Sequence, residues 1–413
     1  MPAHPSQQPQ PNTLFSLPAL PALGAPTSLT LQRYPAQHQH VSLQAWDAAD
    51  EYLLNHASEL ALPENAHIII LNDDFGALTC ALSHYAVTWQ SDSWVARKGC
   101  QTNLSLNQLQ DRPVRYLDSL TPLSSSHIPK VDLVLMKLPR SHALLEYQLA
   151  SLQEIAINTP IVAAGKVKSV QRSVLDVFTR YLGKTTTSLA VKKARLIFSG
   201  DQQQTEQQPE GKPAQTVKPL PEPTVWKTES PNFTLFNYAN VFSRAQLDIG
   251  ARLLLDNLPN AGNQSVIDLG CGNGILGLTL LYQALENGTP IKKMIFVDES
   301  SMALASAYKN VEANVPKALP HCEFILSNCL EELQKEKVNL VLCNPPFHQQ
   351  NTITDHVAWQ MFNEAKRILH PNGELRVVAN RHLQHHDKMK RLFGGFRVVA
   401  SNKKFSILSS FKK

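Results

Sequence analysis

The chain has 413 residues, of which 43% are hydrophobic and 18% charged, and its formal net charge is +5 at pH 7. This length suffices for two domains with full cores, and no apolar run approaches the ~20 residues of a membrane-spanning helix, so we expect no membrane partner. The N-terminus lacks the basic and apolar segments of a secretory signal, and the six cysteines are spaced singly, which predicts a cytoplasmic protein with reduced thiols and no metal site.

Composition and periodicity divide the chain into four segments. Residues 1–40 are rich in Pro, Gln and Ala, and we expect them to form a poorly ordered extension with a few apolar contacts. Residues 41–200 alternate strand and helix patterns, which indicates a parallel sheet. The expected elements there are 67–71, 77–84, 86–90, 131–136, 144–157, 161–164 and 170–181. Residues 201–223 have the Gln and Pro content of a linker. The alternation resumes at Arg244 and runs to the end, so two α/β domains of similar size are predicted, the second over residues 224–413.

A glycine-rich loop follows the first strand of the second half. Residues 265–269 form an apolar strand pattern that contains Asp268, and Gly270, Gly272 and Gly274 follow at alternate positions. Such glycines let the backbone turn sharply and approach a ligand, and the helix that follows presents free N–H groups. The spacing differs from the dinucleotide-binding Gly-x-Gly-x-x-Gly motif, although a lone glycine loop does not exclude that class. Asp268 suits the cationic group of an amino-acid ligand.

A second motif follows the apolar run of residues 338–343. Asn344 stands at the carboxyl end of this expected strand, where open α/β sheets bind their ligands. Pro345 and Pro346 fix two φ angles and keep Asn344 out of helical geometry. The Asn344 side-chain oxygen and the Pro345 carbonyl can each accept one N–H of a planar amine, while Phe347 stacks on the substrate. For these four residues alone, a simple turn after a strand is an equally good interpretation.

The two halves resemble each other without gaps around both motifs. Residues 131–140 align with residues 338–347, and Gly76 aligns with Gly274. The first half has lost the candidate chemistry at the matching positions, where Ile70 replaces Asp268, Asn72 and Asp74 replace Gly270 and Gly272, and Lys137-Leu138 replaces Asn344-Pro345. Side chains would there fill the space that a ligand needs. We therefore expect a duplicated fold with an inactive N-terminal copy.

Together, the two motifs resemble the class I S-adenosylmethionine methyltransferases that act on exocyclic or amide nitrogens. The second half is further similar to the bacterial ribosomal RNA guanine-N2 methyltransferases, in which a degenerate domain precedes an active one. Residues 344–350, 354–359, 373–375 and 378–383 carry this similarity. The Gln349-Gln350 pair and residues 379–383 resemble the large-subunit (23S rRNA) members more than their small-subunit (16S rRNA) relatives.

The resemblance implies two tandem Rossmann-like domains, S-adenosylmethionine as cofactor and the N2 amine of a guanosine in ribosomal RNA as the methyl acceptor. The residues it implies for the cofactor are Asp268, Gly270, Gly272, Gly274, Asp298 for the ribose, Asn328 for the adenine, and Asn344. Those it implies for catalysis are Asn344, Pro345, Pro346 and Phe347. Asp298 could instead be a solvated strand-end carboxylate and Asn328 a plain turn residue. No catalytic base is needed, because positioning and desolvation suffice with a sulfonium methyl donor.

Basic residues gather in the second part of the inactive copy, with Asp176 as the one acidic residue among them. Such runs are more often solvated faces than binding sites, but a retained inactive copy with a basic stretch suits an RNA platform. The residues we expect to contact RNA are Lys166, Lys168, Arg172, Lys184, Lys192 and Lys193.

The same motifs are compatible with other functions. A 16S rRNA guanine-N2 methyltransferase or a protein-glutamine N5 methyltransferase could use the same strand end. A non-enzymatic RNA-binding assembly factor would be expected to have damaged loops in both halves, whereas the second loop is intact. We expect the protein to act as a monomer.

Overall fold

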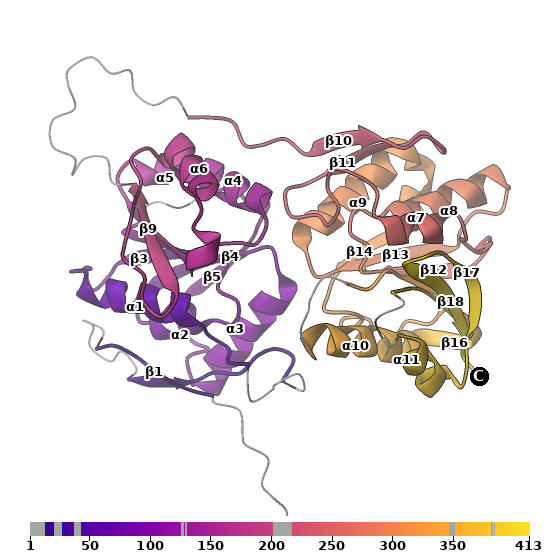
Figure 1. The fold of residues 1–413 in the computed structure, drawn as a ribbon, viewed down its shortest axis with the longest axis horizontal. Helices are drawn as coiled ribbons and strands as arrows, with labels where there is room; N and C mark the ends of the chain where they lie inside the picture. Colours follow the sequence, from indigo (N-terminus) through magenta and orange to yellow (C-terminus); the bar gives the residue numbers. More distant parts are fainter. Residues whose placement is uncertain are drawn as a thin grey trace, which may run out of the picture. The chain divides into compact units, whose positions relative to one another are not determined.

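The computed structural model describes most of the chain as two compact units, Met1–Pro221 and Glu222–Lys413 (Figure 1). Of residues 352–355 only the backbone is described. The described residues are 13–19, 27–36, 43–124, 128, 130–200, 217–346, 352–380, 383 and 385–413.

The first unit is built on a seven-stranded sheet. Its strands are β3 (His67–Leu71), β4 (Ala86–Ser91), β5 (Val114–Asp118), β6 (Leu133–Lys137), β7 (Pro160–Lys166), β8 (Thr186–Thr187) and β9 (Ala194–Gly200). Its helices are α1 (Ala48–Glu59), α2 (Ala77–Ala81), α3 (Trp94–Leu106), α4 (His142–Ser151), α5 (Gln153–Ala156), α6 (Arg172–Leu182) and the 3-10 turn η2 (Val167–Ser169). The strand order is β5-β4-β3-β6-β7-β9-β8, and only β9 runs antiparallel to its neighbours.

The second unit has a sheet of the same size. Its strands are β12 (Ser265–Leu269), β13 (Lys293–Asp298), β14 (Cys322–Leu326), β15 (Val338–Cys343), β16 (Leu369–Asn380), β17 (Arg397–Ser401) and β18 (Phe405–Phe411), preceded by a hairpin of β10 (Thr224–Lys227) and β11 (Thr234–Asn237). Its helices are α7 (Ile249–Leu255), α8 (Ile275–Glu286), α9 (Ser301–Asn314), α10 (Thr352–Ile368), α11 (His385–Phe393) and the 3-10 segment η4 (Pro316–His321).

The two sheets share one topology. The second has the order β14-β13-β12-β15-β16-β18-β17, which repeats the first strand for strand, with β18 antiparallel in the place of β9. The pairing register agrees as well, because Leu71 faces Met136 as Leu269 faces Cys343. Gly76 and Gly274 precede the matching helices with φ angles of 83° and 76°. The predicted α/β class, with two tandem copies of one fold, is confirmed.

Part of the N-terminal extension belongs to the first unit. The expectation of a poorly ordered segment over residues 1–40 is wrong for residues 13–19 and 27–36, where β1 (Leu14–Ser16) pairs antiparallel with β2 (Ser28–Thr30). Phe15, Leu29 and Leu31 are buried in the core, and the Phe15 ring centroid lies 4.8 Å from that of Trp46. Burial of these apolar side chains opposes the entropy of ordering the segment.

In each unit, an equivalent pair of asparagines holds the segment around the second strand of the N-terminal hairpin by hydrogen bonds to its backbone. At the C-terminus of α3, the capping residue Asn107 bonds both backbone polar groups of Thr30 (2.8 and 2.8 Å), and Asn103 of the helix bonds those of Gln32 (2.9 and 2.8 Å). On α9, Asn314 bonds those of Thr234 (2.8 and 2.9 Å), and Asn310 bonds those of Phe236 (2.7 and 3.2 Å). The hairpin β1–β2 is thus the counterpart of β10–β11, and the duplicated unit includes it.

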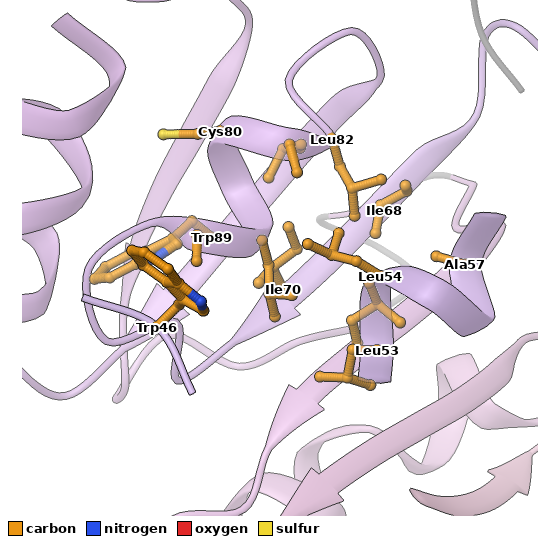
Figure 2. Close-up of a cluster of buried hydrophobic side chains, with 14 of the residues drawn as sticks. Trp46, Leu53, Leu54, Ala57, Ile68, Ile70, Cys80, Leu82 and Trp89 are labelled. Carbon is orange, nitrogen blue, oxygen red and sulfur yellow. The ribbon is translucent and has the colours of Figure 1, made fainter. Parts of the chain in front are cut away.

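The central strand β3 explains why the first copy has an intact core but a different site. Its residues 68–71 are buried on both faces of the sheet, as expected for a parallel strand covered by helices. Ile70, which takes the position of Asp268, lies among the apolar side chains of Leu54, Trp89 and their neighbours (Figure 2). The first unit therefore has an apolar core side chain at the position where the second unit has the buried carboxylate of Asp268.

Residues 217–221 of the predicted linker belong to the first unit. Residues 201–216 lie outside the described part of the chain. Gln153 exchanges two hydrogen bonds with the Lys218 backbone, at 2.8 and 2.9 Å, and Leu220 packs against the core beside α4 and α6. The boundary between the units accordingly falls at Pro221–Glu222.

Candidate functional site

The candidate site residues of the second unit lie at or just after the ends of four strands, which meet at one edge of its sheet. Strands β12, β13, β14 and β15 are parallel, and their register places Leu269 beside Val297 and Cys343, and Asp298 beside Leu326. The residues that follow these strand ends therefore converge, as ligand-binding residues do in open α/β sheets.

The glycine loop has the backbone geometry that its sequence predicts. Gly270, Gly272 and Gly274 all have positive φ angles, of 68°, 53° and 76°. A Cβ atom on Gly274 would lie 2.8 Å from the Ala307 side chain, whereas one on Gly272 would meet nothing within 4 Å. Gly274 is therefore required for packing against α9, and Gly272 leaves open space beside the backbone that a ligand can approach.

Asp268 presents a free carboxylate oxygen under this loop. The residue is fully buried, and its Oδ2 accepts a hydrogen bond of 2.9 Å from the Gly277 amide. Oδ1 is buried and has no hydrogen-bond partner among the described residues. Burial raises the pKa of Asp268 to about 7. An orphaned buried acceptor of this kind fits an ammonium group supplied by a ligand.

Asp298 and Asn328 support the loops around the same edge. Asp298 is the last residue of β13, as predicted, and its carboxylate accepts hydrogen bonds from the amides of Gly272 (2.9 Å) and Ser300 (3.0 Å). Asn328 is buried, and its Nδ2 donates to Glu331 Oε1 at 2.5 Å. Asp298 thus fixes the backbone of the glycine loop and of the turn before α9, whereas Asn328 contacts another side chain. Their roles toward ribose and adenine stay predictions.

Asn344 stands directly after β15, with Pro345 buried and Pro346 exposed. Its Nδ2 donates to Asp248 Oδ2 across 3.4 Å. Its Oδ1 is buried and accepts no hydrogen bond from the described part of the chain. The side chain therefore has an unused acceptor, which is what the grip on a planar amine requires. Phe347 lies outside the described residues.

The first unit fills the matching place with charge. Lys137 ends β6 where Asn344 follows β15, and its buried ammonium lies 2.7 Å from Asp50, 3.0 Å from Asp74 and 3.5 Å from Asp47. Burial raises the pKa of Asp50 to about 7, while the Lys137 charge opposes that rise. The carboxylates, Asp50 above all, raise the pKa of Lys137 against the effect of burial. No amide acceptor remains at this position.

Asn72 closes the loop of the first unit. It takes the left-handed position of Gly270, with φ 60° against 68°, and Asn tolerates this conformation better than most residues. Its side chain donates to the Lys137 carbonyl and exchanges hydrogen bonds with Gln148, all at 2.9 Å. The predicted loss of the cofactor loop therefore has a structural basis, since the Asn72 side chain joins the end of β6 to α4 at the position that Gly270 takes in the second unit.

Most of the predicted RNA-contacting residues lie at the carboxyl edge of the first sheet. Lys166 pairs with Ala194, and the Val167 amide donates to the Lys193 carbonyl at 2.9 Å, so η2 adjoins the β8–β9 turn. We call the five exposed residues of this region the basic edge: Lys166, Lys168, Arg172, Lys192 and Lys193.

Lys184 is separated from the basic edge. Its carbonyl accepts from Ser199 near the far end of β9. Ser199 lies five positions along the strand from Ala194, which corresponds to about 17 Å. The structure therefore brings five of the six predicted residues together and leaves Lys184 apart.

Asp248 is the site residue that the sequence analysis missed. Its only sequence signal is that of a helix N-cap before α7, and its contact with Asn344 spans 96 residues of chain. Among the described residues, no group of three His, Cys, Asp or Glu side chains could hold a metal ion. No helix in the described ranges is long and apolar enough to cross a membrane.

Two family models match the chain in tandem. Residues 23–203 match the RLMG N-terminal domain, and residues 232–409 match the methyltransferase small domain. Together they span both structural units.

Curated relatives match over nearly the whole chain. The ribosomal RNA large subunit methyltransferase G of Pseudoalteromonas atlantica is 51% identical, covering 94% of this chain and 97% of its own length. The protein of the same name from Aeromonas salmonicida is 48% identical, covering 93% and 97%.

A solved structure shares the two-unit fold. The T. thermophilus 16S rRNA N2 G1207 methyltransferase (RsmC), in complex with AdoMet and guanosine, superposes with a TM-score of 0.71 over 94% of this chain and 95% of its own, at 20% identity. At this identity the likeness concerns the fold. The sequence matches decide the family, and the chain belongs to the ribosomal RNA large subunit methyltransferase G family.

Proposed function

We propose that the chain transfers a methyl group from S-adenosylmethionine to the exocyclic N2 amine of a guanosine in 23S rRNA, giving N2-methylguanosine. Membership of the family supports an rRNA methyltransferase of the large subunit acting in the cytoplasm. The single observation that supports an amine as acceptor is the buried, unpartnered Oδ1 of Asn344 at the carboxyl edge of the intact sheet.

The residues of the second unit fit the cofactor. Asp268 Oδ1 would accept the ammonium of its methionine end, and the backbone at Gly272 leaves room for close approach. Asp298, whose carboxylate also accepts from the Gly272 and Ser300 amides, would take the ribose hydroxyls. Asn328 would contact the adenine. When bound, the cofactor supplies a methyl group activated on a sulfonium.

The work of this chain is then to position the amine. Asn344 Oδ1 and the Pro345 carbonyl accept its two N–H groups, which directs the nitrogen lone pair toward the methyl group. Phe347 would stack on the base. The acceptors are held by a strand end and two prolines, so little reorganisation is needed when the substrate arrives.

Cofactor affinity should decrease at low pH because of Asp268. Its pKa is raised to about 7, so the carboxylate is ionised above that value and protonated below it. Since the ammonium prefers the ionised form, we expect the Kd to rise about tenfold from about pH 7.5 to about pH 6. Isothermal titration calorimetry with S-adenosylmethionine measures this dependence. In Asp268→Asn the affinity should be weak and flat with pH; an unchanged slope would contradict the assignment.

The basic edge supports RNA as the partner of the first unit. Four of its five side chains have no acidic partner closer than 4.0 Å in the described part of the chain, whereas Lys192 pairs with Glu51 at 2.6 Å. Unpaired surface cations can each displace one counterion from an RNA phosphate. We propose that the first copy retains RNA binding through this edge and has lost cofactor binding.

Charge reversal at Lys166, Lys168, Arg172 and Lys193 should weaken RNA binding and flatten its salt dependence. Each lost phosphate contact should lower the slope of log K against log salt by about one. Filter binding of 23S rRNA fragments over a salt series measures it, with circular dichroism to verify folding. Lys130→Glu is a control outside the basic edge, because Lys130 is exposed, pairs with Asp132 at 3.1 Å and precedes β6 at the opposite edge of the sheet. A folded variant with the wild-type slope would refute the platform.

The proposed reaction is tested by incubating the protein with methyl-labelled cofactor and rRNA from cells that lack the protein. Nucleoside digestion should place the label in N2-methylguanosine of the 23S rRNA. Label in 16S rRNA would support the small-subunit alternative, and label in protein would support glutamine methylation. No transfer to any of them would support a non-enzymatic RNA-binding factor.

A further inference from the structure

Asp248 contacts the proposed catalytic amide from another part of the chain. It is the N-cap of α7, and its Oδ2 accepts from the Ala251 amide at 3.0 Å. The same oxygen faces Asn344 Nδ2 at 3.4 Å. Because the N-cap fixes the carboxylate at the helix end, its direction toward the strand end is set before any ligand binds.

This contact decides which way the Asn344 amide points. A carboxylate only accepts hydrogen bonds, so the NH₂ group and not the oxygen must face Asp248. The amide oxygen then points away from Asp248, and it is this oxygen that is buried and without a partner among the described residues. A flipped amide would place two acceptors together and offer NH₂ to a substrate amine, which would repel it.

The first unit has the same arrangement with a different partner. Asp47 caps α1 as Asp248 caps α7, and its Oδ1 lies 3.5 Å from Lys137 Nζ. In both copies a capping carboxylate thus faces the residue at the end of the strand. Where the amide has been lost, another hydrogen-bond donor has taken its place.

We infer that Asp248 is a positioning residue for methyl transfer, one that holds the Asn344 amide with its oxygen toward the substrate amine. This inference rests on the proposed function. Asp248 acts through Asn344, so its loss should lower kcat and leave cofactor binding unchanged.

Two substitutions separate this role from helix capping. Serine is as good an N-cap as aspartate but too short to reach Asn344, so Asp248→Ser keeps the cap and removes the contact. Asparagine keeps an acceptor oxygen at the same position, so Asp248→Asn should retain most of the wild-type activity. The matched control is Asp47→Ser, which makes the same change at the corresponding cap of the first unit.

The measurements are kcat and KM for 23S rRNA from cells lacking the protein, cofactor Kd by calorimetry, and the thermal midpoint. We expect kcat of Asp248→Ser to fall by about 10- to 100-fold, because the Asn344 amide would no longer be held in the orientation that positions the substrate amine. The cofactor Kd and the thermal midpoint should be unchanged. Asp248→Asn should stay within several-fold of wild type, and Asp47→Ser should match wild-type kcat.

Equal kcat for Asp248→Ser and wild type would overturn the inference, because capping alone would then explain the residue. A loss of cofactor affinity would also overturn it, since Asp248 would then act on the cofactor. Failure of the proposed function gives a different result, namely a wild-type protein that methylates no rRNA.

Discussion

Replacing Asn344 by alanine is expected to lower kcat by about 100-fold or more while changing cofactor affinity by no more than several-fold. The substitution removes the buried Oδ1 that accepts the substrate amine, but it leaves Asp268 and the glycine loop intact. Methyl transfer with 23S rRNA in excess over the protein measures the first quantity, and calorimetry the second.

Asn339→Ala is the matched control for this change. Asn339 lies near the start of the same strand, β15, where its exposed side chain accepts from the Ser265 amide at 3.0 Å. Its loss should leave kcat unaltered. Wild-type turnover in Asn344→Ala would show that the strand end is not the site of the reaction.

The second large effect is expected on stability, in Lys137→Met of the first unit. The substitution leaves Asp50, which is 1% exposed, without its nearest cation at 2.7 Å. Removing one partner of a buried pair costs about 3–5 kcal/mol, because a charge or an unpaired carboxyl stays in the core. Urea unfolding followed by tryptophan fluorescence measures this change, because three of the five tryptophans, Trp46, Trp89 and Trp94, lie in the first unit.

The destabilisation by Lys137→Met should also depend on pH. Burial raises the folded-state pKa of Asp50 from 3.8 to about 7, and loss of Lys137 raises it further. When the pKa of a carboxyl group is higher in the folded than in the unfolded chain, the protein loses stability as the pH rises above the pKa of the unfolded chain. The carboxyl group then ionises in the unfolded chain, whereas in the folded chain it stays protonated up to a higher pH. The difference from wild type should therefore be larger at about pH 8 than at about pH 5.

Lys192→Met provides the comparison with an exposed pair. The Lys192 side chain is 71% exposed, and its pair with Glu51 should contribute less than about 1 kcal/mol. Similar effects of the two substitutions would mean that the Lys137 cluster does not stabilise the first unit.

The features that the sequence predicted correctly are those set by local pattern. The apolar run before Asn344 had to be a buried strand, and the gapless match between the halves placed Lys137 at the corresponding strand end. Ile70 and Asn72 predicted that the first loop binds no cofactor. Ile70 lacks the charge of Asp268 at the corresponding position, and Asn72 lacks the backbone freedom of Gly270.

The features that escaped prediction depend on contacts between distant residues. Asp248 carries only a capping signal, and its partner Asn344 lies 96 residues away. The N-terminal hairpin was hidden by its Pro- and Gln-rich surroundings, and the asparagines that hold it lie 71 and 77 residues away. Nothing in the local sequence of either segment indicates these partners.

The most direct test of the proposed function is to map N2-methylguanosine in the large-subunit rRNA of cells that lack the protein. Mass spectrometry of rRNA fragments should show one such nucleotide missing, restored by the wild-type chain and not by Asn344→Ala. Retention of every N2-methylguanosine in the large-subunit rRNA of those cells would contradict the account.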